Sequence, residues 1–209
     1  APPPVFRAAG HRLVLVDLAE GCIEACRRRF SACGHIEYHV NDGYSLDVVP
    51  DGSIDFAFSF DSLVHAEADV IRAYVMQLAK KLQPDSVGFL HHSNLGAYPR
   101  AVSLVRAVPS ARLQALLGRA GILVNLTHWR SASMTASLFP EFCRAAGLRC
   151  VSQEWINWGG GPYLIDCFSV FAPRSSIWAK PNRVYKNRWF AREAARIAAW
   201  QRLYRRGEA

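Results

Sequence analysis

Three aspartates follow successive apolar segments of the chain. Asp17 ends the segment 12–18, Asp42 follows the segment 36–40, and Asp61 follows the segment 54–60. In open α/β sheets, ligands lie beyond the carboxyl ends of the strands. An acidic residue there can accept hydrogen bonds from both hydroxyls of a ribose, and a second can hold an adenine amino group. The ordered set therefore favours a nucleoside ligand, although each aspartate alone is equally typical of a helix cap or a turn.

Histidines form the second group of candidate reactive residues. His65 follows the third apolar segment, His91 and His92 end a fourth at 87–91, and His128 comes later. Because histidine titrates near neutral pH, each could act as a general base. Strand alternation predicts that one of the adjacent pair is buried and the other faces the cleft. A structural, hydrogen-bonded imidazole is the alternative for each, and the pair lacks the third ligand that a zinc site needs.

The elements that must position these residues alternate along the chain. Strands are predicted at 12–18, 36–40, 54–60 and 87–91, and helices at 20–30, 66–82, 110–120 and 135–146. This alternation predicts an α/β fold with a mostly parallel sheet and helices on both faces. Two further strands, 148–157 and 164–171, are separated only by a short glycine-rich segment, so they should form an antiparallel hairpin. That segment precedes a strand rather than a helix, which favours a hairpin turn over a phosphate loop.

Charge is distributed unevenly over the 209 residues. The net charge is +8, and the stretch from Arg174 to the end holds ten basic and two acidic residues, so the first 172 residues are neutral. A hydrophobic content of 51% excludes disorder, and no apolar run is long enough to span a membrane. The first residues are not expected to form a secretory signal, and the six cysteines form no C-x-x-C pair, which favours reduced thiols over zinc. These features predict a cytoplasmic protein.

The basic tail is predicted to form an amphipathic helix over 188–206. Arginines fall on one side, and Trp189, Phe190, Ile197, Trp200 and Tyr204 fall on the other. Three interpretations remain open. The apolar side could pack on the body, the helix could lie on an anionic membrane surface at the inner membrane, or it could bind nucleic acid. The last is less favoured, because no base-reading motif accompanies the charge.

The motifs together resemble those of class I S-adenosylmethionine-dependent methyltransferases over residues 8–172. Leu15-Val16-Asp17 resembles the motif whose acidic residue binds the cofactor ribose, and Asn41-Asp42-Gly43 resembles the adenine-contacting motif. The segment 51–61 resembles the fourth-strand motif beside the methionine part, and 82–86 resembles the turn before the fifth strand. The resemblance implies a Rossmann-like fold ending in an antiparallel hairpin, with S-adenosyl-L-methionine as cofactor. The cofactor-binding residues it implies are Asp17, Leu18, Asp42, Gly43, Ser59, Phe60 and Asp61.

The chain departs from this family at one point. The family's glycine-rich loop should precede Asp17 by about 20 residues, and nothing in 1–10 matches it. We therefore expect an incomplete methyltransferase-like body at 1–172, followed by a basic helical extension at 173–209. With the first strand missing, the sheet should either have a gap or close it in a non-native way. Whether the body binds the cofactor without that loop is left open.

The resemblance implies methyl transfer to an oxygen or nitrogen of a small molecule or a glycan, with His65, His91 and His92 as candidate catalytic residues. Segments 62–65 and 91–94 resemble bacterial enzymes that methylate sugars or cell-surface glycans, and Trp129, Trp155 and Trp158 could contact a sugar or simply pack. The alternative is a non-catalytic, methyltransferase-like adaptor that acts through its basic helix. A nucleotide-dependent dehydrogenase is disfavoured by the terminal hairpin.

Overall fold

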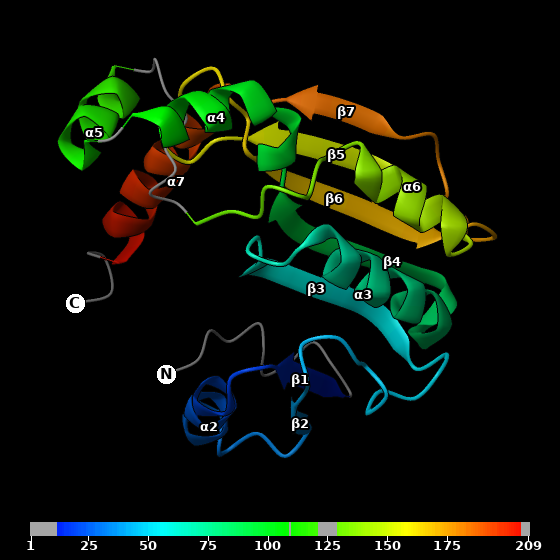
Figure 1. Cartoon of the computed structure of the whole chain (residues 1–209). Helices are drawn as coiled ribbons and strands as arrows, with labels where there is room; N and C mark the ends of the chain where they lie inside the picture. Colours follow the sequence, from blue (N-terminus) through cyan, green and yellow to red (C-terminus); the bar gives the residue numbers. More distant parts are fainter. Residues whose placement is uncertain (1–11, 109, 121–128, 206–209) are drawn as a thin grey trace.

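The computed structural model describes residues 12–108, 110–120 and 129–205. Within these ranges the strands form two separate sheets (Figure 1). The small sheet pairs β1 with β2 in parallel, and the large sheet has the order β3-β4-β6-β5-β7. The strands are β1 (Leu13–Asp17), β2 (Ile36–Val40), β3 (Ile54–Leu63), β4 (Leu82–Ser93), β5 (Leu148–Ile156), β6 (Asp166–Pro173) and β7 (Arg183–Lys186).

The large sheet is mixed. β3 and β4 are parallel, β6 runs antiparallel to both β4 and β5, and β7 is parallel to β5. The predicted terminal hairpin is therefore confirmed, with β6 inserted between β4 and β5. No strand among the described residues joins β1 to β3, so the predicted gap in the sheet is present. Strand β7 was not predicted, and it brings part of the predicted extension into the sheet.

Helices connect and cover these strands. The described residues contain six α-helices and one short 3-10 helix. The α-helices are α2 (Glu20–Arg29), α3 (Ala68–Lys81), α4 (Pro99–Ala107), α5 (Ala111–Arg119), α6 (Leu138–Ala145) and α7 (Phe190–Arg205), and the 3-10 helix is η1 (Leu95–Ala97). Helix α5 begins as predicted, because the Ser110 hydroxyl accepts a hydrogen bond from the Leu113 N–H at 3.4 Å. Helix α4 was not predicted, because its region lacks clear periodicity.

The main core lies between the large sheet and the pair α3 and α6, which cover the same face (Figure 1). Ile71 and Val75 of α3, Phe139 of α6 and Phe171 of β6 are buried there. Gly88 of β4 is required beneath Phe171, because a Cβ at this position would lie 2.1 Å from the ring. The core thus holds β3, β4 and β6 in fixed register, and the candidate site lies at one end of these strands.

The opposite face of the large sheet carries an aromatic row. Phe56, Phe58 and Phe60 alternate along β3 and remain exposed, since the α3-facing positions of the strand are those between them. Phe58 stacks on Phe89 of β4 at 5.3 Å between ring centroids. Phe60 continues this row to the end of β3, where it contacts residues of the candidate site.

Candidate functional site

Asp61 marks the carboxyl end of β3 with an unusual backbone. Its φ is +60°, and it is the only non-glycine residue with positive φ in the described part of the chain. The Asp61 N–H donates to Nδ1 of His91 on β4 at 3.1 Å. Aspartate tolerates the left-handed region better than most residues, but the conformation still costs of the order of 1 kcal/mol. Strained residues of this kind cluster at functional sites, so Asp61 is a strong site candidate.

A buried arginine connects Asp61 to a second carboxylate. Arg130 donates from Nε to Oδ1 of Asp166 at 2.6 Å, and its Nη2 lies 3.6 Å from Oδ1 of Asp61. The side chains of Arg130 and Asp166 are 7% and 1% exposed, whereas that of Asp61 is 62% exposed. Arg130 therefore balances the charge of the buried Asp166 carboxylate and also lies near the Asp61 carboxylate. Because Asp61 is largely exposed, its carboxylate remains accessible to a ligand.

The pairing of Arg130 with Asp166 was not predicted from the sequence. The two residues are 36 positions apart, and Arg130 comes from the segment between α5 and α6, where no element was predicted. One signal was available, because Asp166 interrupts an otherwise apolar strand. A charged residue in such a position is rarely buried without a partner. The identity of that partner depends on the tertiary fold.

His91 is fully buried beside this pair. Its ring lies between Phe60 and Phe168, at centroid distances of 5.2 and 4.7 Å. Because Nδ1 accepts from the Asp61 N–H, the neutral ring carries its proton on Nε2, which lies 3.6 Å from Oδ1 of Asp166 and has no hydrogen-bond partner. In this arrangement the imidazole supports the backbone of Asp61 and faces a carboxylate.

His92 points to the opposite face, as alternation predicts. Its Nδ1 donates to the Ser93 carbonyl and its Nε2 accepts from the Ser169 hydroxyl, both at 2.9 Å, and its ring stacks on Phe139. Burial lowers the pKa of His92 to about 4. The expectation that one of the two histidines faces the cleft is wrong, since both are fully buried. Phe60 and Phe168 cover the His91 ring, and Phe139 covers the His92 ring.

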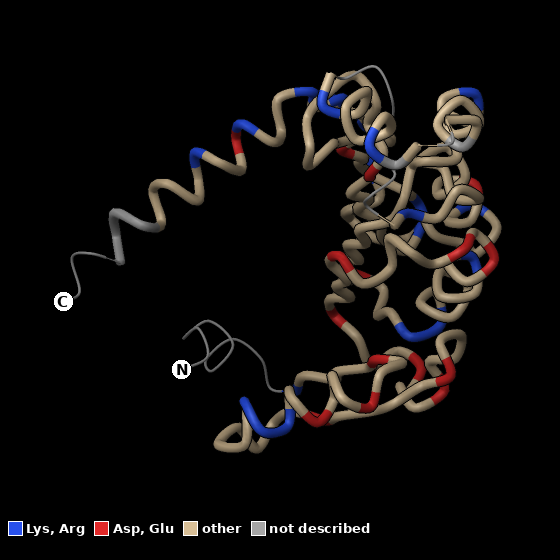
Figure 2. The backbone as a smooth tube through the Cα atoms, turned by 60° about the vertical axis from the view of Figure 1, so that its left-hand side comes forward, with Lys and Arg blue, Asp and Glu red and all other residues tan. Residues whose placement is uncertain are grey.

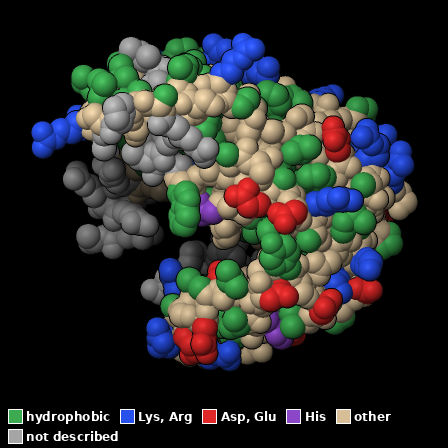
Figure 3. Space-filling model, viewed as in Figure 1, with side chains coloured by type: hydrophobic (Ala, Val, Ile, Leu, Met, Phe, Trp, Pro, Cys, Tyr) green, Lys and Arg blue, Asp and Glu red, His purple; other side chains and the backbone are tan. Residues whose placement is uncertain are grey.

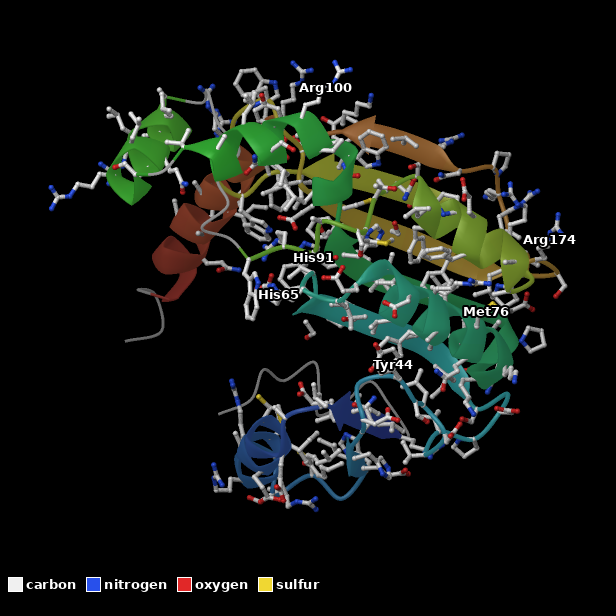
Figure 4. All side chains as sticks on the ribbon, in the orientation of Figure 1. Tyr44, His65, Met76, His91, Arg100 and Arg174 are labelled. Atoms are coloured by element: carbon white, nitrogen blue, oxygen red, sulfur yellow. The ribbon has the colours of Figure 1, made fainter. Side chains whose placement is uncertain are left out.

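His65 is the exposed histidine of the three candidates. It lies two residues beyond β3, and its ring is 5.6 Å from that of Trp129, which is 82% exposed. Figure 4 shows His65 and His91 at the same end of the large sheet. Figure 3 shows the molecule hollowed between the large sheet and the β1–β2 unit. His128, the remaining candidate base, lies outside the described residues.

A second group of predicted residues meets at the ends of β1 and β2. The Asp17 carboxylate accepts from the Ala19 N–H at 2.7 Å. Asp42 accepts from the N–H groups of Tyr44 and Ser45 at 2.8 and 2.6 Å, and these bonds lower its pKa. Gly43 has a φ of +83°, and a Cβ there would lie 3.6 Å from Leu18. The structure thus brings these four residues close together, and both aspartates also serve local turns.

Ser59 and Phe60 are the two residues of β3 directly before Asp61. The Ser59 hydroxyl is buried without a hydrogen-bond partner, and Phe60 packs edge-on against Trp158 at 6.0 Å. Metal chemistry has no visible site here, since the described residues contain no cluster of three His, Cys, Asp or Glu side chains that could hold an ion. The cysteines are all free, and burial raises the pKa of Cys150 and Cys167 to about 12.

Comparisons with known proteins agree with the observed fold. The model of a methyltransferase domain matches residues 4–85. In structure the chain is similar to the PH0226 protein from Pyrococcus horikoshii, with 17% identity, 78% of this chain and 72% of that chain covered, and a TM-score of 0.53. The chain has the class I methyltransferase fold. The resemblance found in the sequence motifs is thereby confirmed.

Two further solved structures carry the same fold. A TehB-like methyltransferase from Corynebacterium glutamicum shares 13% identity over 80% of this chain and 71% of its own, with a TM-score of 0.50. PKMT2 from Rickettsia typhi, also solved in complex with AdoHcy, shares 12% identity over 78% and 44%, with a TM-score of 0.51 in that complex. No curated protein matches the sequence. The chain thus spans about 70% of the Pyrococcus horikoshii and Corynebacterium glutamicum proteins and less than half of PKMT2.

Proposed function

We propose that the protein transfers the methyl group of S-adenosyl-L-methionine to an oxygen or nitrogen of a small molecule or a glycan. The observation that supports this best is Asp61, a strained and accessible carboxylate at the carboxyl end of β3. It is held from two sides, by the His91 ring and by the buried Arg130. A backbone conformation that is maintained at a cost suits a residue that positions a ligand.

The residues at the strand ends fit the cofactor in chemical type. We propose that Asp17 accepts from the ribose hydroxyls and that Asp42 faces the adenine amino group, with Leu18 and Gly43 forming an apolar contact beside the base. Ser59, Phe60 and Asp61 would line the methionine part. The unpartnered, buried Ser59 hydroxyl supports this assignment, because such groups normally find a partner. S-Adenosyl-L-methionine supplies an electrophilic methyl group when it is bound.

The acceptor would lie between Asp61 and the exposed pair of His65 and Trp129. We assign His65 as the general base that takes the proton lost by the acceptor hydroxyl or amine, because it is the exposed candidate. His91 acts as a positioning residue through the Asp61 backbone, and His92 supports the core from the far face. The exposed Trp129 ring suits the apolar face of a sugar, which favours a glycan or glycoside as acceptor.

Calorimetric titration with S-adenosylhomocysteine tests the cofactor assignment. It is carried out on the 209-residue chain and on the product of the complete coding sequence. Asp17→Asn should weaken binding at least tenfold, because a carboxylate that accepts two hydroxyl bonds is lost. The matched control is Asp55→Asn, which removes an exposed carboxylate from β3 without touching the site. Absence of binding by both proteins, or equal effects of the two variants, contradicts the proposal.

Methyl transfer is then followed by the release of S-adenosylhomocysteine with sugars, phenols and amines as acceptors. His65→Gln should lower kcat about 10²-fold or more, as loss of a general base does. His39→Gln, a change of the same kind on β2, should leave kcat unchanged. If His65→Gln retains full kcat at all pH values, His65 is not the base.

A non-catalytic adaptor remains the second candidate function. The observation in its favour is α7, whose amphipathic surface is exposed along most of its length. An adaptor would show no cofactor binding in either protein of the titration, while its α7-dependent interactions would persist. The two functions are therefore separated by the same calorimetric experiment.

A further inference from the structure

Helix α7 leads away from the body of the protein (Figure 2). Its first turn is anchored, because Phe190 packs edge-on against Trp158 at 4.7 Å and Phe168 at 5.6 Å. The Glu193 carboxylate also accepts from the side-chain amide of the buried Asn187 at 2.7 Å. From Arg196 onward the described side chains are exposed or half-exposed. The packing of the whole helix on the body, one of the three interpretations of the sequence, is therefore limited to its first turn.

An exposed apolar stripe runs from Trp189, directly before α7, along the helix to Trp200. Trp189, Ile197 and Trp200 are 59%, 53% and 61% exposed. At 100° per residue they fall within a sector of about 80°. A helix of this length is marginally stable in water unless its apolar side is covered. The exposed stripe therefore indicates that this side of α7 packs against the surface of a partner. Glu193 lies in the same sector, but its charge is engaged by Asn187.

A row of arginines runs directly beside this stripe. Arg192 and Arg196 are exposed and fall in the neighbouring sector of α7, and the exposed Arg188 lies two residues before the helix. The Arg192 guanidinium lies over the Trp189 ring at 4.5 Å. Arg202, Arg205 and Arg206 follow in the sequence, whereas the first 172 residues are neutral. Six of the ten basic residues from Arg174 onward thus lie in the segment 188–206, in or directly beside the helix that exposes Trp200.

We propose that α7 binds an anionic lipid surface, lying in the plane of the interface. Its tryptophans would enter the boundary between headgroups and acyl chains, and its arginines would reach the lipid phosphates beside them. Nucleic acid could bind the arginines through its phosphates but would leave the apolar stripe exposed. The presence of the arginines and the apolar stripe side by side therefore favours lipid. No helix in the described residues is long and apolar enough to cross a membrane. This interaction is independent of the proposed methyl transfer.

Co-sedimentation of the full chain with lipid vesicles tests the proposal. Vesicles of equal parts phosphatidylcholine and phosphatidylglycerol should bind the protein, and binding should fall steeply between 50 and about 500 mM salt as charges are screened. Vesicles of phosphatidylcholine alone should bind it at least tenfold more weakly. Failure to bind the anionic vesicles, or equal binding to both kinds, overturns the proposal.

Charge-matched variants separate the stripe from the arginines. The double variant Ile197→Ser, Trp200→Ser removes only apolar surface and should weaken binding at least tenfold, whereas Ala195→Ser on the other side of α7 should not. Arg196→Gln should weaken binding about fivefold. Its control, Arg72→Gln, causes the same charge change on α3 and should have no effect. Equal losses in Arg196→Gln and Arg72→Gln would indicate unspecific attraction and overturn the assignment to α7.

Two further measurements test whether nucleic acid or a second copy of the chain binds the apolar stripe instead of lipid. Fluorescence anisotropy with a labelled duplex DNA should show only weak, salt-sensitive binding that Trp200→Ser leaves unchanged. DNA binding stronger than vesicle binding overturns the proposal in favour of nucleic acid. Light scattering after gel filtration should show a monomer. A dimer that Trp200→Ser dissociates would mean that a second copy covers the stripe, which also overturns it.

Discussion

Replacing Arg130 by methionine tests the buried charge arrangement behind Asp61. The Arg130 side chain is 7% exposed, and its Nε lies 2.6 Å from a carboxylate that is 1% exposed. The substitution leaves the Asp166 charge in the interior without its partner, with only the His91 ring nearby at 3.6 Å. Removing one member of a buried ion pair costs about 3–5 kcal/mol. For a chain of this size, that corresponds to a fall in Tm of about 6–20 °C.

Chemical unfolding followed by circular dichroism measures this loss. The double variant Arg130→Met, Asp166→Asn should recover at least half of the lost free energy of unfolding, because it removes both charges. Arg27→Met provides the surface control. It breaks an exposed ion pair with Glu24 on α2, and such pairs contribute at most about 1 kcal/mol. If Arg130→Met costs less than 1 kcal/mol, or if the double variant is no more stable than the single one, the reasoning is refuted.

Two further predictions concern the core. Gly88→Ala should lower the free energy of unfolding by about 1–3 kcal/mol, because its Cβ would meet the Phe171 ring at 2.1 Å. Gly118→Ala on α5, where nothing lies within 4 Å, should instead raise the free energy of unfolding by about 0.5–1 kcal/mol. A Gly88→Ala variant more stable than Gly118→Ala would contradict the packing described. The pKa of His92 lies near 4 in the folded chain against 6.5 for an ordinary histidine, so the unfolded chain binds more protons between these values. Stability should therefore fall by about 3 kcal/mol as the pH drops from 6.5 to 4, and denaturant titrations across this range should show a markedly smaller fall in His92→Gln.

Local sequence patterns were sufficient for much of the fold. The order of strands and helices followed from periodicity, and the antiparallel pairing of β5 with β6 followed from a connection too short for a crossover. The separation of the two sheets also followed, from the absence of the family's first motif. Strand β7 was missed because its four residues are all exposed and show no alternation of apolar and polar types. It exists because it extends the edge of β5, which is a tertiary contact.

The candidate site was predictable only in part. Its positions at the strand ends were found, since a turn or an acidic residue after an apolar segment is a local feature. The orientation of the histidines was not, because alternation places His91 and His92 on opposite faces without saying what covers each face. Phe60 and Phe168 close over His91, and Phe139 closes over His92. These rings come from strands and helices distant in the sequence.

The sequence by itself determined the type of fold, the set of strand-end aspartates and the concentration of positive charge after Arg174. These are properties of residue type and spacing, which local geometry converts directly into strands, turns and a helix. Only the tertiary structure decided that Arg130 and Asp166 share one buried site behind a strained Asp61, and that α7 exposes its tryptophans instead of burying them. Both outcomes depend on which surfaces meet, and the burial of a charge or an aromatic ring is decided by neighbours that no local pattern specifies.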